Sequence, residues 1–97
     1  MREFILRLND GEGFCEGFDS YPTLLRPANI PSQSVAGWGS HRILVEGAEI
    51  SFSDEEFGFQ VVFETGEISE QRAQEIMDDI AANIRAKTDA TTSIVPL

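Results

Sequence analysis

The apolar residues of this chain change their spacing between residues 57–64 and residues 69–87. From Phe57 to Phe63 every second residue is large and apolar, which predicts a strand because successive strand side chains point to opposite faces. In the second segment apolar residues recur every three or four positions, which predicts one apolar stripe on an amphipathic helix. The stripe consists of Ala73, Ile76, Met77, Ile80, Ala81 and Ile84. The simplest fold packs this stripe on the phenylalanine face of the strand.

The two ends of the predicted helix carry residues that suit them. Ser69 is expected as the N-cap, because its side-chain oxygen can accept a hydrogen bond from a free backbone N–H of the first turn. Glu70 near the start, and Arg85 and Lys87 in the last turn, match the helix dipole. The helix is therefore predicted over about residues 69–87.

Two segments before this pair, residues 42–46 and 48–53, alternate between apolar and polar positions. Gly47-Ala48 fits a two-residue hairpin loop with glycine first. The acidic run at 54–56 then turns the chain into the phenylalanine strand. We therefore predict a three-stranded antiparallel meander over residues 42–64.

Residues 3–8 alternate in the same way, and Asn9-Asp10-Gly11 is typical of a tight turn. Residues 14–18 are the expected return strand of an N-terminal hairpin. The predicted fold class is α+β: a small antiparallel sheet, made of this hairpin and the meander at 42–64, packed against one amphipathic C-terminal helix.

Two regions, residues 19–41 and 88–97, show no regular period. Three prolines recur at short intervals in the first region, and proline disrupts helices and inner strands, so it is predicted to be an irregular loop. The tail at 88–97 is polar up to Ser93, and its apolar end at 94–97 is expected to dock on a sheet edge of its own or another chain. The length of 97 residues suits one domain.

The charge of the chain narrows the class of partner. It carries 17 acidic and 7 basic residues, a formal net charge of −10, which repels phosphates and argues against binding to nucleic acid or to an anionic membrane. No apolar run approaches the length of a membrane span or forms a signal peptide. Cys15, the single cysteine, can form no internal disulfide, which fits a reducing compartment. We expect a cytoplasmic protein whose partner is neutral or basic.

No motif predicts catalysis or a bound cofactor. His41 follows Ser40, but a triad needs partners that meet in space and a carboxylate that orients the histidine. Cys15 lies among acidic residues, which suppress its thiolate. Residues 9–12 and 54–56 offer oxygen ligands without the spacing of a calcium loop. We therefore predict no catalytic residue, no metal and no cofactor.

The candidate binding residues are Trp38, Glu75, Asp78 and Asp79. Trp38 lies between two glycines, and tryptophan is enriched at binding hot spots; the preferred interpretation is nevertheless that it folds inward and caps the core. The three acidic residues give the outer face of the predicted helix a negative patch, which is either a solvated face or a docking surface for a basic partner.

Three functions fit this picture. The preferred one is a non-enzymatic interaction module for a basic partner. In size, acidity and α+β character the chain is similar to small bacterial immunity and inhibitor proteins, which neutralise basic enzymes. The second is a structural homo-oligomer, such as a homodimer, in which residues 94–97 extend a neighbour's sheet. The third is a small ligand-binding or enzymatic domain, with the loop at 19–41 as a lid over the sheet and His41, Tyr21 and a nearby carboxylate as its polar groups.

Overall fold

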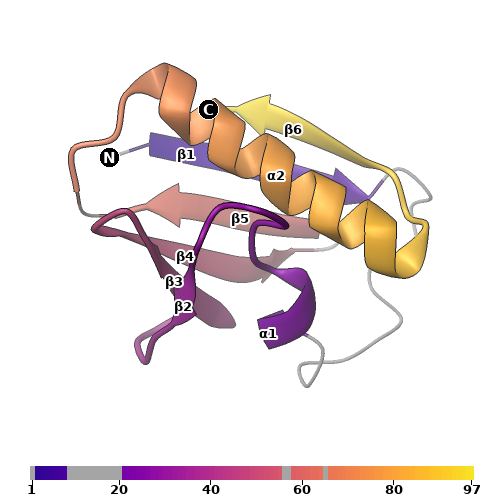
Figure 1. The fold of residues 1–97 in the computed structure, drawn as a ribbon, viewed down its shortest axis with the longest axis horizontal. Helices are drawn as coiled ribbons and strands as arrows, with labels where there is room; N and C mark the ends of the chain where they lie inside the picture. Colours follow the sequence, from indigo (N-terminus) through magenta and orange to yellow (C-terminus); the bar gives the residue numbers. More distant parts are fainter. Residues whose placement is uncertain (1, 9–20, 56–57, 65) are drawn as a thin grey trace.

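The computed structural model describes residues 2–8, 21–55, 58–64 and 66–97, and these contain six strands and two helices (Figure 1). The elements in chain order are β1 (Arg2–Leu8), α1 (Tyr21–Leu24), β2 (Gln33–Ser34), β3 (His41–Val45), β4 (Ala48–Glu55), β5 (Gly58–Phe63), α2 (Glu70–Thr88) and β6 (Thr92–Pro96).

The six strands form one antiparallel sheet in the order β2-β3-β4-β5-β1-β6. The long helix α2 crosses one face of this sheet (Figure 1). The neighbours β3, β4 and β5 are the meander that the sequence predicts over residues 42–64, and the α+β fold class is confirmed. Phe57, the first residue of the predicted phenylalanine strand, lies outside the described residues.

β1 lies inside the sheet, with a partner on each side. Those partners are β5 and β6, so the neighbours of β1 differ from the predicted hairpin partner at 14–18, which lies outside the described residues. Apolar contacts explain this placement, because Leu6 is opposite Phe59 on one side and opposite Ile94 on the other. Cross-strand apolar pairs of this kind stabilise sheet pairing.

The C-terminal tail forms the last strand of the sheet. β6 pairs with β1 of its own chain, which confirms that the apolar end at 94–97 docks on a sheet edge. The strand begins at Thr92, so the polar Ser93 belongs to it as well. The pairing continues to Leu97, whose backbone N–H donates to the carbonyl of Glu3 at 2.9 Å.

The turn between β3 and β4 is Glu46-Gly47, one residue earlier than the predicted Gly47-Ala48. Both residues have positive φ, 51° and 82°, as a type I′ turn requires. The loop is shifted because Ala48 is fully buried and pairs with Val45 in the sheet. Arg72 of α2 donates to both carboxylate oxygens of Glu46, with a distance of 3.0 Å from Nε, and this contact holds the turn against the helix.

Helix α2 begins and packs largely as predicted. The Ser69 side chain accepts from the backbone N–H of Arg72 at 3.0 Å, which confirms the N-cap. Five members of the predicted stripe are fully buried against the sheet: Ala73, Ile76, Met77, Ile80 and Ile84. The sixth, Ala81, is only half-buried, whereas the polar Asn83 is buried. Neither helix in the described ranges combines the length and the apolar character that crossing a bilayer demands.

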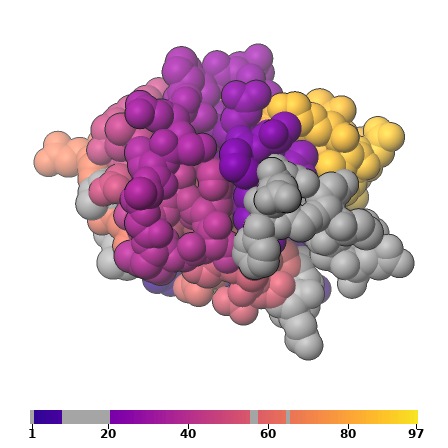
Figure 2. Space-filling model, turned by 90° about the horizontal axis from the view of Figure 1, so that it is seen from below, coloured from indigo at the N-terminus to yellow at the C-terminus, as the bar shows by residue number. Residues whose placement is uncertain are grey.

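The region predicted as an irregular loop contributes to the core. Its described part, residues 21–41, contains α1 and the short β2, and Tyr21, Leu24 and Leu25 are buried in the cluster that α2 covers. Seen from below, these purple and magenta residues lie over a large part of the described surface (Figure 2). They cover sheet surface that a single helix leaves open.

Asn83 joins this region to the helix. Its Nδ2 donates to the backbone carbonyls of Thr23 at 2.9 Å and of Leu24 at 3.1 Å. These carbonyls lie at the end of α1, where a helix leaves acceptors without intrahelical partners. A buried polar side chain is favourable only when it is hydrogen-bonded, and this contact explains why Asn83 takes a core position.

The packing of α2 on the sheet is tested by Ile80→Asp. Truncating a buried isoleucine costs about 2–5 kcal/mol, and an unpaired buried charge adds to that cost, which together approach a typical domain stability of about 5–15 kcal/mol. We expect circular dichroism to show no cooperative unfolding transition. The matched control is Ala82→Asp at an exposed position, which should remain folded; a folded Ile80→Asp variant would contradict the packing described here.

Candidate protein-binding surface

Trp38 lies on the surface, between β2 and β3, with 60% of its area exposed. The interpretation that it folds inward and caps the core is therefore wrong. Gly37, one of the two glycines beside Trp38, makes room for a neighbouring side chain. A Cβ on Gly37 would lie 2.2 Å from Cδ of Arg42, so only glycine leaves room for the arginine at this position.

Arg42 supports the indole from below. Its guanidinium carbon lies 5.4 Å from the Trp38 ring centroid, a favourable cation–π distance. The Arg42 side chain is buried and forms ion pairs with Glu64 and, at 3.4 Å, with Glu49. A buried cation is tolerated when it is paired, and these two carboxylates provide the compensation. The indole of Trp38 is therefore exposed to solvent and packs on a buried, ion-paired Arg42.

This cluster lies on the sheet face away from α2. Arg42 pairs with Ser51 across β3 and β4, and both alternate with the apolar residues that pack under the helix. The Nε of Arg42 and the Oγ of Ser51 are buried and have no hydrogen-bond partner within the described ranges.

Asp79 does not belong to an open acidic patch. Its carboxylate accepts from the backbone N–H groups of Asn29 and Ile30, each at 2.8 Å, and from the Asn29 amide at 3.3 Å. Its backbone carbonyl accepts from Ala28 at 3.2 Å. Burial raises the pKa of Asp79, but the hydrogen bonds together outweigh burial and hold the pKa below its ordinary value. Asp79 therefore fastens the Pro-rich region to the helix.

The other two predicted acidic residues lie apart from Asp79. Glu75 accepts from Arg72 at 3.1 Å, and Asp78 accepts from Gln74 at 3.0 Å. Neighbouring residues on a helix are separated by about 100° of rotation, so Asp78 and Asp79 face different sides. Of the three, Asp78 and Glu75 are exposed and Asp79 is half-buried.

Of the polar groups in the lid hypothesis, Tyr21 and a carboxylate are in contact. Tyr21 donates to the Asp54 carboxylate at 2.7 Å, and burial and this bond raise the pKa of Tyr21. Burial lowers the pKa of His41. Each packs on a phenylalanine: the ring centroid of His41 lies 5.9 Å from that of Phe52, and the ring centroid of Tyr21 lies 5.2 Å from that of Phe59. In the described part of the chain no three His, Cys, Asp or Glu residues are grouped as a metal site requires.

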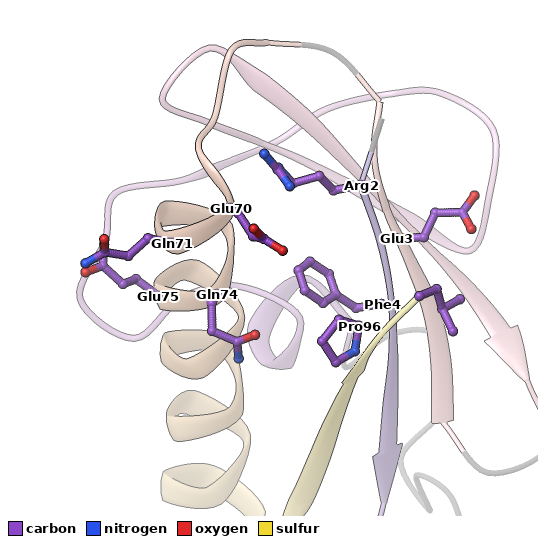
Figure 3. A pocket seen from close by; sticks show the side chains of 9 residues that line it. Arg2, Glu3, Phe4, Glu70, Gln71, Gln74, Glu75 and Pro96 are labelled. Carbon is purple, nitrogen blue, oxygen red and sulfur yellow. The ribbon is translucent and has the colours of Figure 1, made fainter.

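A cavity of about 550 Å³ lies where the start of α2 approaches the ends of β1 and β6 (Figure 3). Its lining residues come from these three elements and from Leu97, which follows β6; they are Arg2, Glu3, Phe4, Glu70, Gln71, Gln74, Glu75, Pro96 and Leu97. Sequence reasoning missed this site because the cavity exists only where β6 lies beside β1, and the pairing of the first and last strands has no local signal.

The side chains in the cavity differ in direction. Phe4 and Glu70 point toward each other across the space between β1 and α2, and Pro96 lies beside Phe4 (Figure 3). Arg2 is turned toward the start of the helix, where its Nε donates to the carbonyl of Ile68 at 3.2 Å. Glu3 points to the opposite side of β1 from Phe4, as strand alternation requires. The cavity thus has an apolar floor and a carboxylate at its helix side.

Comparison of this chain with protein-family models, curated proteins and solved structures finds no match.

The contact between the Asp79 carboxylate and residues 29–30 is tested by Asp79→Asn. The neutral amide is a weaker acceptor for the N–H groups of residues 29 and 30, and we expect a loss of about 1–3 kcal/mol in unfolding free energy at neutral pH. Because the pKa of Asp79 is lower in the folded than in the unfolded protein, its ionised carboxylate stabilises the fold above the unfolded-state pKa of about 3.9. This stabilisation is lost as pH falls through the folded-state pKa. The difference between wild type and variant should therefore shrink below about pH 4.

Asp78→Asn is the matched control in the same chemical denaturation experiment. It removes the same charge one residue earlier without touching residues 28–30, and should change stability by less than about 0.5 kcal/mol. Equal losses for the two variants, or a difference for Asp79→Asn that persists in acid, would contradict the anchoring contact.

The contact between Arg42 and Trp38 is tested by Gly37→Ala. The added methyl group would overlap the Arg42 side chain and displace the guanidinium from the indole. Trp38 is the single tryptophan, so the fluorescence anisotropy reports on its side chain alone. The anisotropy should fall because the indole loses its contact with Arg42. Gly47→Ala is the control: its methyl group meets no atom within 4 Å, so the Trp38 signal should stay unchanged despite some strain at its positive φ. An unchanged anisotropy in Gly37→Ala would exclude the supporting contact.

Proposed function

We propose that this protein is a non-enzymatic interaction module that binds a basic protein, and that the cavity beside Glu70 receives a basic side chain of that partner. The observation that carries the proposal is the lining of the cavity. Glu70 directs its carboxylate toward the apolar Phe4 and Pro96 (Figure 3), whereas Glu75, which also lines the cavity, is paired with Arg72. Long basic side chains bury an aliphatic stem on apolar surface while their charged end pairs with a carboxylate.

The distribution of ion pairs supports a negative surface on this protein and therefore a basic partner. Arg42 is paired with two glutamates on the far face of the sheet, and Arg72 is paired with Glu46 and Glu75. In contrast, the described residues provide no ion pair or hydrogen bond for the Glu70 carboxylate. Internal pairing of these arginines leaves a negative excess at the surface, which attracts a basic partner.

The size of the cavity suits this occupant. Its volume of about 550 Å³ lies in the range of small-ligand sites, about 300–1,000 Å³, and accepts one arginine or lysine side chain with its neighbours. A basic enzyme that this protein neutralises is the partner class we favour. The proposal leaves the lid hypothesis aside, because neither His41 nor Tyr21 lines this cavity.

The test is a titration of the labelled protein with an arginine-containing peptide, followed by NMR. We expect amide shifts at Phe4, Glu70 and Gln74, and an affinity that falls at least about tenfold between about 50 and 500 mM salt, because exposed charges are screened. Glu70→Gln should weaken binding.

Two controls make this result specific. A peptide with citrulline in place of arginine removes the charge and should bind far more weakly. Asp89→Asn removes one charge at the other end of α2, at an exposed residue, and should bind like the wild type. The proposal would be overturned if the affinity were the same at low and high salt, with citrulline in place of arginine, and in the Glu70→Gln variant.

A further inference from the structure

We infer that the partner binds as an extra β-strand along the outer edge of β6, with alternating basic and apolar residues. This inference rests on the proposed function, since it uses the same cavity. In the part of the chain that the structure describes, β6 is the last strand of the sheet and pairs on one side, with β1. Strand addition to such an edge is a recurrent mode of peptide recognition.

The register decides which backbone groups are available. The N–H of Leu97 donates to the carbonyl of Glu3, which makes this a hydrogen-bonded pair. Because hydrogen-bonded and non-hydrogen-bonded pairs alternate in an antiparallel ladder, Val95 also bonds toward β1. The N–H and C=O groups of Thr92 and Ile94 therefore point away from β1. Pro96 has no N–H to offer but directs its carbonyl to the same edge.

The side chains of β6 define the two faces of this edge. Ile94 and Pro96 are opposite Leu6 and Phe4, which lie in the core under α2, so they are on the helix side, and Thr92 shares their face by strand alternation. Val95 and Leu97 are on the other side, where 43% and 68% of their areas are exposed. A strand added here has one row of side chains beside α2 and one row beside this exposed apolar pair.

The row beside α2 faces an acidic and polar flank of the helix. Glu70, Gln74 and Asp78 are spaced by four residues and so lie on one side of α2. Their spacing along the axis is about 6 Å, close to the 6.4–6.8 Å or so between alternate residues of a strand. Lysine or arginine at alternate positions can therefore pair with Glu70 and Asp78, with one basic side chain entering the cavity. Apolar residues between them cover Val95 and Leu97.

The same surface disfavours a second copy of this chain. Two copies would each bring a net charge of −10, and their acidic helix flanks would approach each other. Charge complementarity therefore favours a basic segment over a homodimer.

The experiment uses three peptides of one composition. The first alternates lysine or arginine with valine, the second has the same residues in blocks, and the third is the alternating peptide with N-methylation of the amides that would bond to β6. We expect the alternating peptide to bind at least about tenfold more tightly than the other two, and to slow the hydrogen exchange of the Thr92 and Ile94 amides.

Ile94→Pro tests the edge from the side of the protein. The N–H that it removes points away from β1, so the pairing with β1 can persist, as proline is accepted on the open side of an edge strand. Circular dichroism checks the fold, and Ile94→Val, which keeps the N–H, is the control. We expect Ile94→Pro to weaken binding of the alternating peptide about tenfold and Ile94→Val to have little effect.

The outcomes separate this inference from the proposed function. If all three peptides bind equally and shift Glu70, the basic-partner function stands and strand addition is wrong. If no peptide binds, both are wrong. If sedimentation of the protein alone shows a dimer in which the Ile94 amide is protected, the edge belongs to a second copy and the inference is overturned.

Discussion

The packing of α2 against one face of the sheet is the contact on which the rest of the structure depends. Five residues of the helix stripe are fully buried there, against strands that come from both ends of the chain. Each large apolar side chain buried in this way contributes roughly 1.5–3 kcal/mol. β1, β4 and β5 are neighbours in this layer, so the helix covers strands from distant parts of the chain, and its start borders the cavity.

One helix is too narrow to cover a six-stranded sheet. Polar contacts hold additional segments of the chain beside the helix. Asn83 binds the end of α1, Asp79 binds residues 28–30, and Arg72 binds the turn at Glu46. All three side chains project from α2. The helix therefore organises its surroundings in two ways, through an apolar stripe toward the sheet and through hydrogen bonds toward the segments that flank it.

Local patterns predict the parts of this structure that local physics determines. The period of two in the meander and the period of three to four in α2 gave the fold class, and Ser69 was predictable from its own capping chemistry. The position of β1 between β5 and β6, the burial of Asn83 and the anchoring use of Asp79 were not predictable, since each depends on a partner at least 49 residues away. The cavity belongs to this second group, and Trp38 shows the same limit, because its exposure follows from the buried Arg42 beneath it.

The central position of β1 also has a consequence for folding kinetics. The meander of β3, β4 and β5 closes through short connections, whereas Phe4 meets Val61 on one side and Pro96 on the other. Contacts between residues far apart in sequence incur a larger loss of chain entropy before they form, and they slow folding. Both partners of β1 are synthesised after it, so its pairing depends on the contacts that are most distant in the sequence.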